Sequence, residues 1–192
     1  MLNKKRLNYP KHKNLNLLLF VSAAFSLAGG LFGPLYAVFV EQIGGDLITA
    51  GSAYAIFAIS TGSLIYFIGK WEDRVKHQEK LIVISCALLA VGFFGYMLIQ
   101  RPMHLFMVQI IFGFSEALGT PAYDSVYSKN LIKGKYASGW GMWESMHYII
   151  VAIAATAGGF IAESFGFKTL FFFMFLLSLV GLLISLNLLK KR

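Results

Sequence analysis

Six apolar stretches alternate with short polar segments along almost the whole chain. Lipid cannot satisfy exposed backbone groups, and none of the stretches alternates polar and apolar residues as the strands of a membrane barrel do. Each has about the 20 residues that a helix needs to cross ~30 Å of hydrocarbon. The pattern therefore predicts an all-α membrane protein with six transmembrane helices. Their expected ranges are 15–40, 47–69, 81–100, 103–128, 138–162 and 168–189.

The basic residues fall mainly on one side of these spans. Fifteen of the 17 Lys and Arg residues lie in the N-terminal tail, in the loops after the second and fourth spans, and at the C-terminal end; only Arg101 and Lys168 lie on the other side. By the positive-inside rule, this asymmetry predicts a multi-pass protein of the cell (inner) membrane with both termini in the cytoplasm. We expect a basic cytoplasmic tail at 1–14, a six-helix transmembrane domain at 15–189 and a basic cytoplasmic end at 190–192.

Composition supports a membrane protein and argues against several other classes. Hydrophobic residues make up 57% of the chain and charged residues 14%, whereas soluble domains carry about 25% charged residues. The net charge of +8 comes from short loops and tails between apolar spans, so we expect the lipid bilayer, and no nucleic acid, as a partner. The single cysteine, Cys86, excludes an intrachain disulfide and a cysteine metal cluster. No hydrolase or phosphate-loop motif is present, so we expect no enzyme, no catalytic residues, no metal and no cofactor.

Small residues are concentrated in two of the spans, 47–69 and 138–162. Because small residues let membrane helices approach closely, we expect these two spans to pack tightly. The spans 81–100 and 168–189 are richer in Leu, Ile, Phe and Val and are expected to face lipid. Tight packing alone would explain the small residues without any function.

A weak internal repeat links the first and fourth spans through the spacing L-x-x-P-x-Y. A glycine followed four residues later by an acid also recurs near the ends of the second and fifth spans. Such a pattern is typical of two inverted three-helix repeats, a common plan in secondary transporters. The residues of the repeat are Leu31, Pro34, Tyr36, Gly69 and Asp73, which match Leu118, Pro121, Tyr123, Gly159 and Glu163.

The loop between the second and third spans carries a family motif. It reads GKWEDRVKHQEKL from Gly69 to Leu81 and resembles the G-x-x-x-D-R-x-G-R-R signature of the major facilitator superfamily. Gly69, Asp73, Arg74 and Leu81 match, whereas the second glycine and the basic pair do not. With the six spans added, the chain is similar to the N-terminal six-helix half of such a transporter.

The resemblance implies transport of a small molecule by alternating access in a half-size secondary transporter that needs a second six-helix unit. That unit is either another copy, in a parallel homodimer, or a separately encoded C-terminal half. A non-transporting membrane scaffold and a degenerate transporter fragment stay open as alternatives. The resemblance also assigns gating to Gly69, Asp73 and Arg74; the alternative is that the basic residues of this loop only set topology.

Two positions depart from the drug–proton antiporters of this family. Aligning the fourth span on Gly113 places Gln109 where those proteins carry an arginine, and Ala154 and Ala155 replace the glycine and proline of their fifth-span motif. These departures weigh against proton-coupled drug efflux, although not against transport.

Ionisable residues inside membrane spans usually face a cavity or a partner, because burying a charge in lipid is costly. We predict a substrate or proton path in which aromatic rings hold an apolar or cationic substrate. Glu144 alternatively belongs to the membrane interface, and Asp124 alternatively pairs with Lys129 or Lys133. The predicted path residues are Tyr36, Glu116, Tyr123, Asp124, Glu144 and His147.

Overall fold

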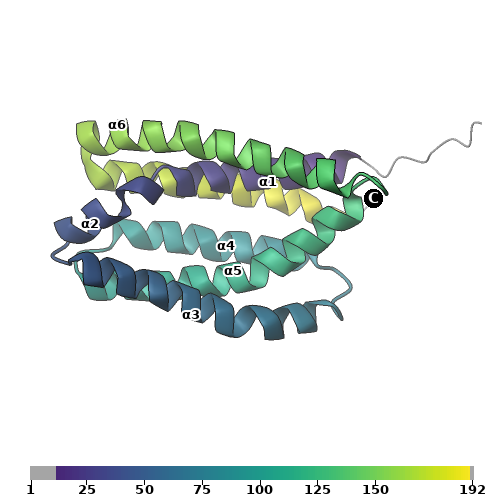
Figure 1. Cartoon of the computed structure of the whole chain (residues 1–192), viewed down its shortest axis with the longest axis horizontal. Coiled ribbons are helices and arrows are strands. Elements are labelled where there is room, and N and C mark those ends of the chain that lie inside the picture. Colours follow the sequence, from purple (N-terminus) through teal and green to yellow (C-terminus); the bar gives the residue numbers. More distant parts are fainter. Residues whose placement is uncertain (1–11, 191–192) are drawn as a thin grey trace, which may run out of the picture.

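The computed structural model describes residues 12–190, which are helical apart from short connections. The helices lie side by side along one long axis (Figure 1). Almost all of the predicted tail at 1–14 and of the end at 190–192 lies outside the described residues. The elements are α1 (His12–Gly30), η1 (Gly33–Leu35), α2 (Tyr36–Gln42), α3 (Leu47–Glu72), α4 (Glu79–Met97), α5 (Pro102–Asn130), α6 (Tyr136–Ser185) and η2 (Leu186–Leu189).

Local sequence explains where these helices break and begin. Gly33 and Pro34 form the 3-10 turn η1 that separates α1 from α2, because proline cannot donate the next backbone hydrogen bond. Asp46 begins α3 as its N-cap: its Oδ1 accepts hydrogen bonds from the Thr49 N–H and Oγ1, both at 2.7 Å. The N–H bond of Thr49 lowers the pKa of the Asp46 carboxyl, with a second contribution from the hydroxyl. Helix α5, by contrast, continues past Pro121 without ending.

Among residues 12–190, five helices are long and apolar enough to cross a membrane, and the last of them runs for 54 residues, from Tyr136 to Leu189. A straight helix of that length would extend for about 80 Å, more than twice the hydrocarbon thickness. Gly166 breaks it with φ 79° and ψ 166°, a conformation that L side chains rarely adopt. The two arms of α6 then run back along each other, and the chain ends near the side where α6 began (Figure 1).

An aromatic core joins the helices at the end that carries η1 and α2. Phe32 is its centre, with ring centroids 5.0 Å from Tyr96 and 5.1 Å from Phe171. Phe39 lies 4.8 Å from Phe171. These edge-to-face contacts connect α2, α4 and the second arm of α6, so this end of the bundle is closed by packed aromatic side chains.

The burial of α3 and α4 differs from the sequence expectation. In the most apolar window of α3 only 6% of the residues are buried, against 44% in α4. The expectation that 81–100 faces outward is therefore wrong, and the small-residue span 47–69 packs closely on one side only, against α5, where a Cβ at Gly113 would lie 2.5 Å from Ser60. The physical reason is position: α4 lies between α5 and α6, whereas α3 contacts the rest of the chain mainly through α5.

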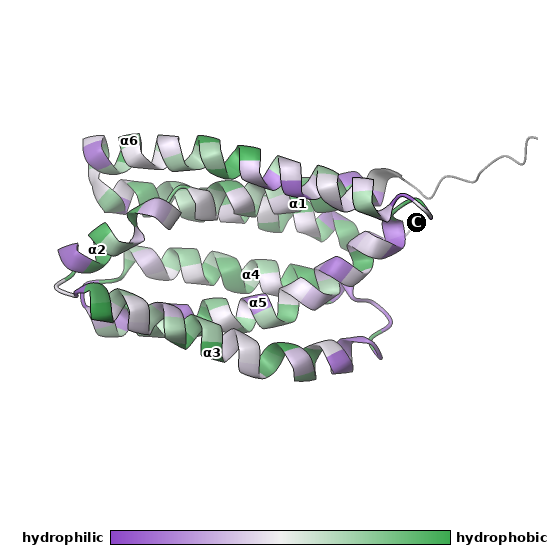
Figure 2. Cartoon of the chain, in the orientation of Figure 1, coloured by the Kyte–Doolittle hydropathy of each residue, from purple (hydrophilic) through white to green (hydrophobic). Residues whose placement is uncertain are grey.

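Polar residues concentrate at the ends of the bundle and in its loops, while apolar residues run along the helices (Figure 2). The α3–α4 loop, the α5–α6 loop and the C-terminus share one end, and the α4–α5 loop and the Gly166 break share the other (Figure 1). The first end thus carries most of the basic residues of the described chain. They are Lys13, Lys70, Arg74, Lys76, Lys80, Lys129, Lys133, Lys135 and Lys190.

Candidate substrate cavity

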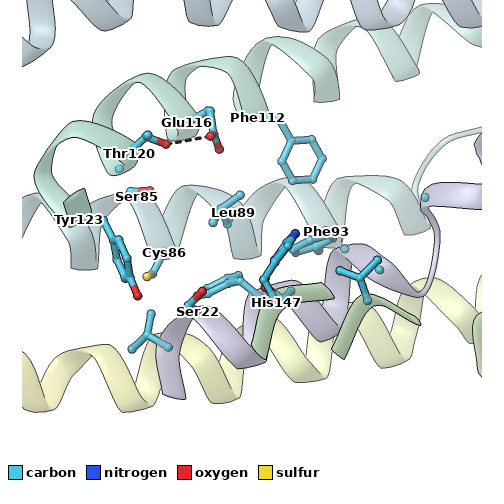
Figure 3. A pocket seen from close by; sticks show the side chains of 18 of the residues that line it. Ser22, Ser85, Cys86, Leu89, Phe93, Phe112, Glu116, Thr120, Tyr123 and His147 are labelled. Carbon is cyan, nitrogen blue, oxygen red and sulfur yellow. Dashed lines mark hydrogen bonds between the residues drawn. The ribbon is translucent and has the colours of Figure 1, made fainter. Parts of the chain in front are cut away.

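A cavity of ≈ 970 Å³ lies among the helices, with walls from α1, α3, α4, α5 and both arms of α6. In Figure 3, Glu116 and Thr120 of α5, Phe93 of α4 and His147 of α6 surround one space. All six residues of the predicted path line this cavity, although they come from α2, α5 and α6. They are Tyr36, Glu116, Tyr123, Asp124, Glu144 and His147.

The acidic part of the cavity is built by α5 and the first arm of α6. The hydroxyl of Thr120 donates to Oε1 of Glu116 at 2.8 Å, one helical turn away (Figure 3). Asp124 lies two turns along α5 from Glu116, and Glu144 lies at the start of α6. Because α5 ends and α6 begins at the same end of the bundle, the three carboxylates are placed toward the basic end.

Aromatic rings cover the wall beside these acids. The Trp143 and His147 rings stack with an interplanar angle of 5° and centroids 5.5 Å apart. Trp140 packs 5.8 Å from Trp143 and 4.8 Å from Tyr127. Tyr127 is fully buried and donates to the carbonyl of Gly139 at 2.7 Å, which ties the end of α5 to the start of α6. The start of α6 thus lines the cavity with Trp140, Trp143 and His147.

Hydrogen bonds between helices position two of the predicted residues. Oγ of Ser26 on α1 lies 2.8 Å from Nδ1 of His147, so the imidazole is held by the helix packed beside it. Nε2 of Gln109 donates to the hydroxyl of Tyr36 at 2.9 Å. Gln109, which the resemblance aligned with an arginine of the drug–proton antiporters, is therefore a neutral partner of a tyrosine.

The other part of the cavity is apolar. Phe112 precedes Glu116 by one turn of α5, on the side away from the acids, and its ring lies 5.2 Å from Phe93 and 5.5 Å from Tyr96. Phe32 and Met174 complete this part of the lining. The cavity thus has a phenyl-rich end toward η1 and an acidic end toward the α5–α6 loop.

One side of the cavity has no cover from the described residues. Glu116 and Glu144 line it and are nevertheless exposed, as are Gly33, Pro34 and Tyr54. Adding a Cβ at Gly29 or Gly33 would meet nothing within 4 Å. The site is therefore a half-cavity, closed by aromatic packing on one side and open along the other.

The predicted gate residues lie outside the cavity, at the end of α3. A Cβ at Gly69 would lie 3.6 Å from Pro121, so this glycine allows α3 to approach α5. Asp73 and Arg74 have exposed side chains. The N–H of Asp73 bonds to the Gly69 carbonyl at 3.1 Å and closes the helix. Their gating role stays a prediction.

The buried polar residues of this loop are two others, Glu72 and Gln78. Gln78 donates to the Glu72 carbonyl at 3.1 Å and accepts from Ser125 and Lys129, each at 2.8 Å. Glu72 is 1% exposed, and neither carboxylate oxygen has a hydrogen-bond partner among the described residues. Lys129 contacts Gln78, so the proposed alternative pairing of this lysine with Asp124 is not formed.

Sequence reasoning missed several residues of the site. Ser26, Tyr96 and Phe112 carry no signal in a single sequence that separates them from ordinary residues of apolar spans. Trp143 had one available signal, its neighbour Glu144, because an aromatic ring beside an acid in a span is consistent with a lined cavity. Glu72 was overlooked because it stands within a charged loop, where acids are normally solvated.

A bundle of apolar helices around a cavity with carboxylates in its wall is the architecture of a membrane transport protein. The family comparison agrees: residues 18–192 match the model of the Major Facilitator Superfamily. The chain belongs to this family of membrane transporters.

Three relatives differ in how much of their own length the chain covers. An uncharacterized MFS-type transporter of Bacillus subtilis, YitZ, is 26% identical over 149 residues, which cover 76% of this chain and 88% of that protein. The multidrug resistance protein MdtG of Salmonella typhimurium is 24% identical over 190 residues, covering 95% of this chain and 46% of that protein. An uncharacterized MFS-type transporter of Methanocaldococcus jannaschii is 21% identical, with 90% of this chain and 45% of that protein covered. The chain thus spans less than half of two of these relatives and most of the first.

Proposed function

We propose that the chain is one half of a secondary transporter that moves a small molecule across the cell membrane by alternating access. The observation that carries the proposal is the ≈ 970 Å³ half-cavity, whose wall includes two exposed acids, Glu116 and Glu144. A carboxylate exposed at the depth of an apolar span is costly unless water, a substrate or a second protein surface faces it. A second six-helix unit over the open side would enclose the cavity.

In this proposal the two arms of α6 cross the membrane separately, which gives six crossings with both termini in the cytoplasm. The basic end of the bundle supports this orientation. The packing of α1 on α6 and of α5 on α3 supports two inverted repeats, because each repeat's first helix then pairs with a helix of the other repeat. Protease protection of tags at both termini in intact cells, with labelling near Asp46 from outside, tests the orientation.

A second copy is the first candidate for the missing unit. A parallel two-fold arrangement would place both copies with the same end in the cytoplasm. The match that covers 88% of YitZ supports half-length members, whereas the match that covers 46% of MdtG favours a separate C-terminal half. The mass of the complex purified in detergent separates the two: two identical chains, or one chain with a different polypeptide.

Alternating access can be tested before any substrate is known. In a Cys86→Ser background, Ser26→Cys places one thiol in the cavity, and Leu183→Cys places one on an outward face that is 63% exposed. An impermeant maleimide added from either side of the membrane should label the first variant and spare the second. Labelling of the Ser26→Cys variant from one side only, under all conditions, would contradict alternating access.

The gate belongs to the same proposal. Gly69 lets α3 approach α5, and the exposed Asp73 and Arg74 are free to contact the second unit at the cytoplasmic end. We expect Asp73→Asn and Arg74→Ala to reduce transport while insertion stays normal, and Lys76→Ala to serve as the matched loop control. Equal transport by all three variants would leave the loop a role in topology alone.

A further inference from the structure

We infer that the cavity binds an amphipathic organic cation, with the charge at the acidic end and the apolar body at the phenyl-rich end. This inference rests on the proposed transport function and names its substrate class. The observation behind it is the charge of the wall. The lining includes three acids, Glu116, Asp124 and Glu144, and none of its described residues is Lys or Arg, although the whole chain has 17 basic and nine acidic residues.

The arrangement of the acids favours a large cation with spread charge. Within residues 12–190 no three His, Cys, Asp or Glu side chains lie close enough to hold a metal ion. The acids instead alternate with ring faces: Glu144 lies one helical turn from Trp140 on one side and from His147 on the other, and Trp143 stacks on His147. Carboxylates beside indole faces are the surroundings that bind ammonium-type cations.

The apolar end supplies the second part of the recognition. Phe112, Phe93 and Phe32 line the cavity beyond Glu116, and their rings belong to the aromatic core that closes the bundle. A ligand whose hydrocarbon body lies against these rings brings its charge within reach of the carboxylates. An anion of the same shape would meet three carboxylates without a compensating cation, so its binding is disfavoured in this low-dielectric space.

Two ions of nearly the same size and opposite charge test the inference directly: tetraphenylphosphonium and tetraphenylborate. The chain offers its own reporter, because two of its three tryptophans, Trp140 and Trp143, line the cavity. The third, Trp71, is 52% exposed at the end of α3. In a Trp71→Phe background reconstituted in liposomes, tryptophan fluorescence therefore reports on the cavity alone. We expect saturable quenching by the phosphonium and none by the borate beyond that of empty liposomes with free tryptophan.

Variants connect this signal to the carboxylates. Glu116→Gln and Glu144→Gln should each weaken phosphonium binding on the order of tenfold, since each removes one counter-charge. Glu163→Gln is the matched control, because it removes one exposed acid near the Gly166 break, outside the cavity, and should leave binding unchanged. Loss of binding in all three variants would assign the effect to net charge and overturn the inference.

The cation site and the proposed alternating access can be contradicted by different results. Equal quenching by both ions would overturn the cation assignment, even if a neutral solute is transported. Unchanged phosphonium binding in a variant that combines Glu116→Gln with Glu144→Gln would overturn it as well. Selective phosphonium binding without labelling of the Ser26→Cys thiol from both sides would support the cation site and contradict the proposed alternating access.

Discussion

Helices α3 and α4 are consecutive spans of similar apolar character, but they differ in how much of their surface the fold buries. Helix α4 buries eight of its 19 residues, whereas α3 buries two of 26, Ala53 and Glu72. The glycines show the same contrast: a Cβ at Gly92 of α4 would meet the Phe112 ring at 2.8 Å, while one at Gly51 or Gly62 of α3 would meet nothing within 4 Å. Small residues in a membrane helix therefore do not show by themselves where the helix packs. In α3 they leave a smooth outer face, which we assign to the second unit.

The largest effect is expected where the packed face has no spare room. Gly158 on the first arm of α6 lies against the backbone of Leu31, and a Cβ there would collide with the Leu31 carbonyl; at the next residue, Gly159, a Cβ would meet nothing within 4 Å. The backbone carbonyl of Leu31 cannot rotate away from an added Cβ as a side chain could. Gly158→Ala should therefore destabilise the fold by about 1–3 kcal/mol. Gly159→Ala is the adjacent control and should melt like the wild type in detergent thermal unfolding. Equal melting of both variants would refute the close α1–α6 contact.

The next prediction tests the open face of α3. Gly51→Leu combined with Gly62→Leu adds bulk where the described chain leaves space, so the fold should keep its melting temperature. If this face contacts a second six-helix unit, the added side chains should separate the complex, and its mass in detergent should fall to that of one chain. As a control, Val180→Leu enlarges an exposed residue on the second arm of α6 and should leave the mass unchanged. If the complex of the α3 variant keeps its mass, the interface with the second unit does not lie on this face of α3.

A smaller effect is expected at Glu72, the one buried acid of α3. Its carboxylate has no hydrogen-bond partner among the described residues, and a buried polar group without a partner costs about 1–3 kcal/mol. Glu72→Met should therefore raise the unfolding temperature, whereas Glu79→Met, at a partly exposed acid of the same loop region, should not. A marked loss of stability in the Glu72 variant would reveal a partner for this carboxylate in the membrane-embedded protein.

The smallest effect is expected at the start of α3. The N-cap hydrogen bonds hold the pKa of Asp46 below its ordinary value of 3.8, so the ionised form is the one that stabilises the folded state. This stabilisation is complete above the ordinary pKa of an aspartate and is lost as the pH falls through the lowered value. Asp46→Ala should speed amide hydrogen exchange at Leu47–Ala50 at neutral pH, and the difference from wild type should shrink in acid. An unchanged exchange rate would show that the cap does not hold this turn in solution.

The sequence alone determined much of the architecture. Apolar length predicted helices because lipid leaves the backbone no other partner. Gly33 and Pro34 form the 3-10 turn η1 inside the span expected over 15–40, whereas Pro121 lies inside α5 without ending it, so a proline alone does not decide where a helix ends. The family resemblance, drawn from Gly69, Asp73 and Arg74, is confirmed by the match over residues 18–192. Six spans were expected, and the structure has five long helices, the last of them broken at Gly166.

Only the tertiary structure decided which faces meet. Glu116, Thr120 and Tyr123 line the cavity from α5, but the sequence of that span carried no information on what lies across from them. Ser26 reaches His147 over 121 positions in sequence, and Gln109 reaches Tyr36 over 73. In a membrane span every outward and inward face is apolar, so the contrast that marks a buried face in a soluble helix is weak. The packing of α4 inside the bundle and of α3 at its edge is decided by side-chain shape between distant segments, which a single sequence does not display.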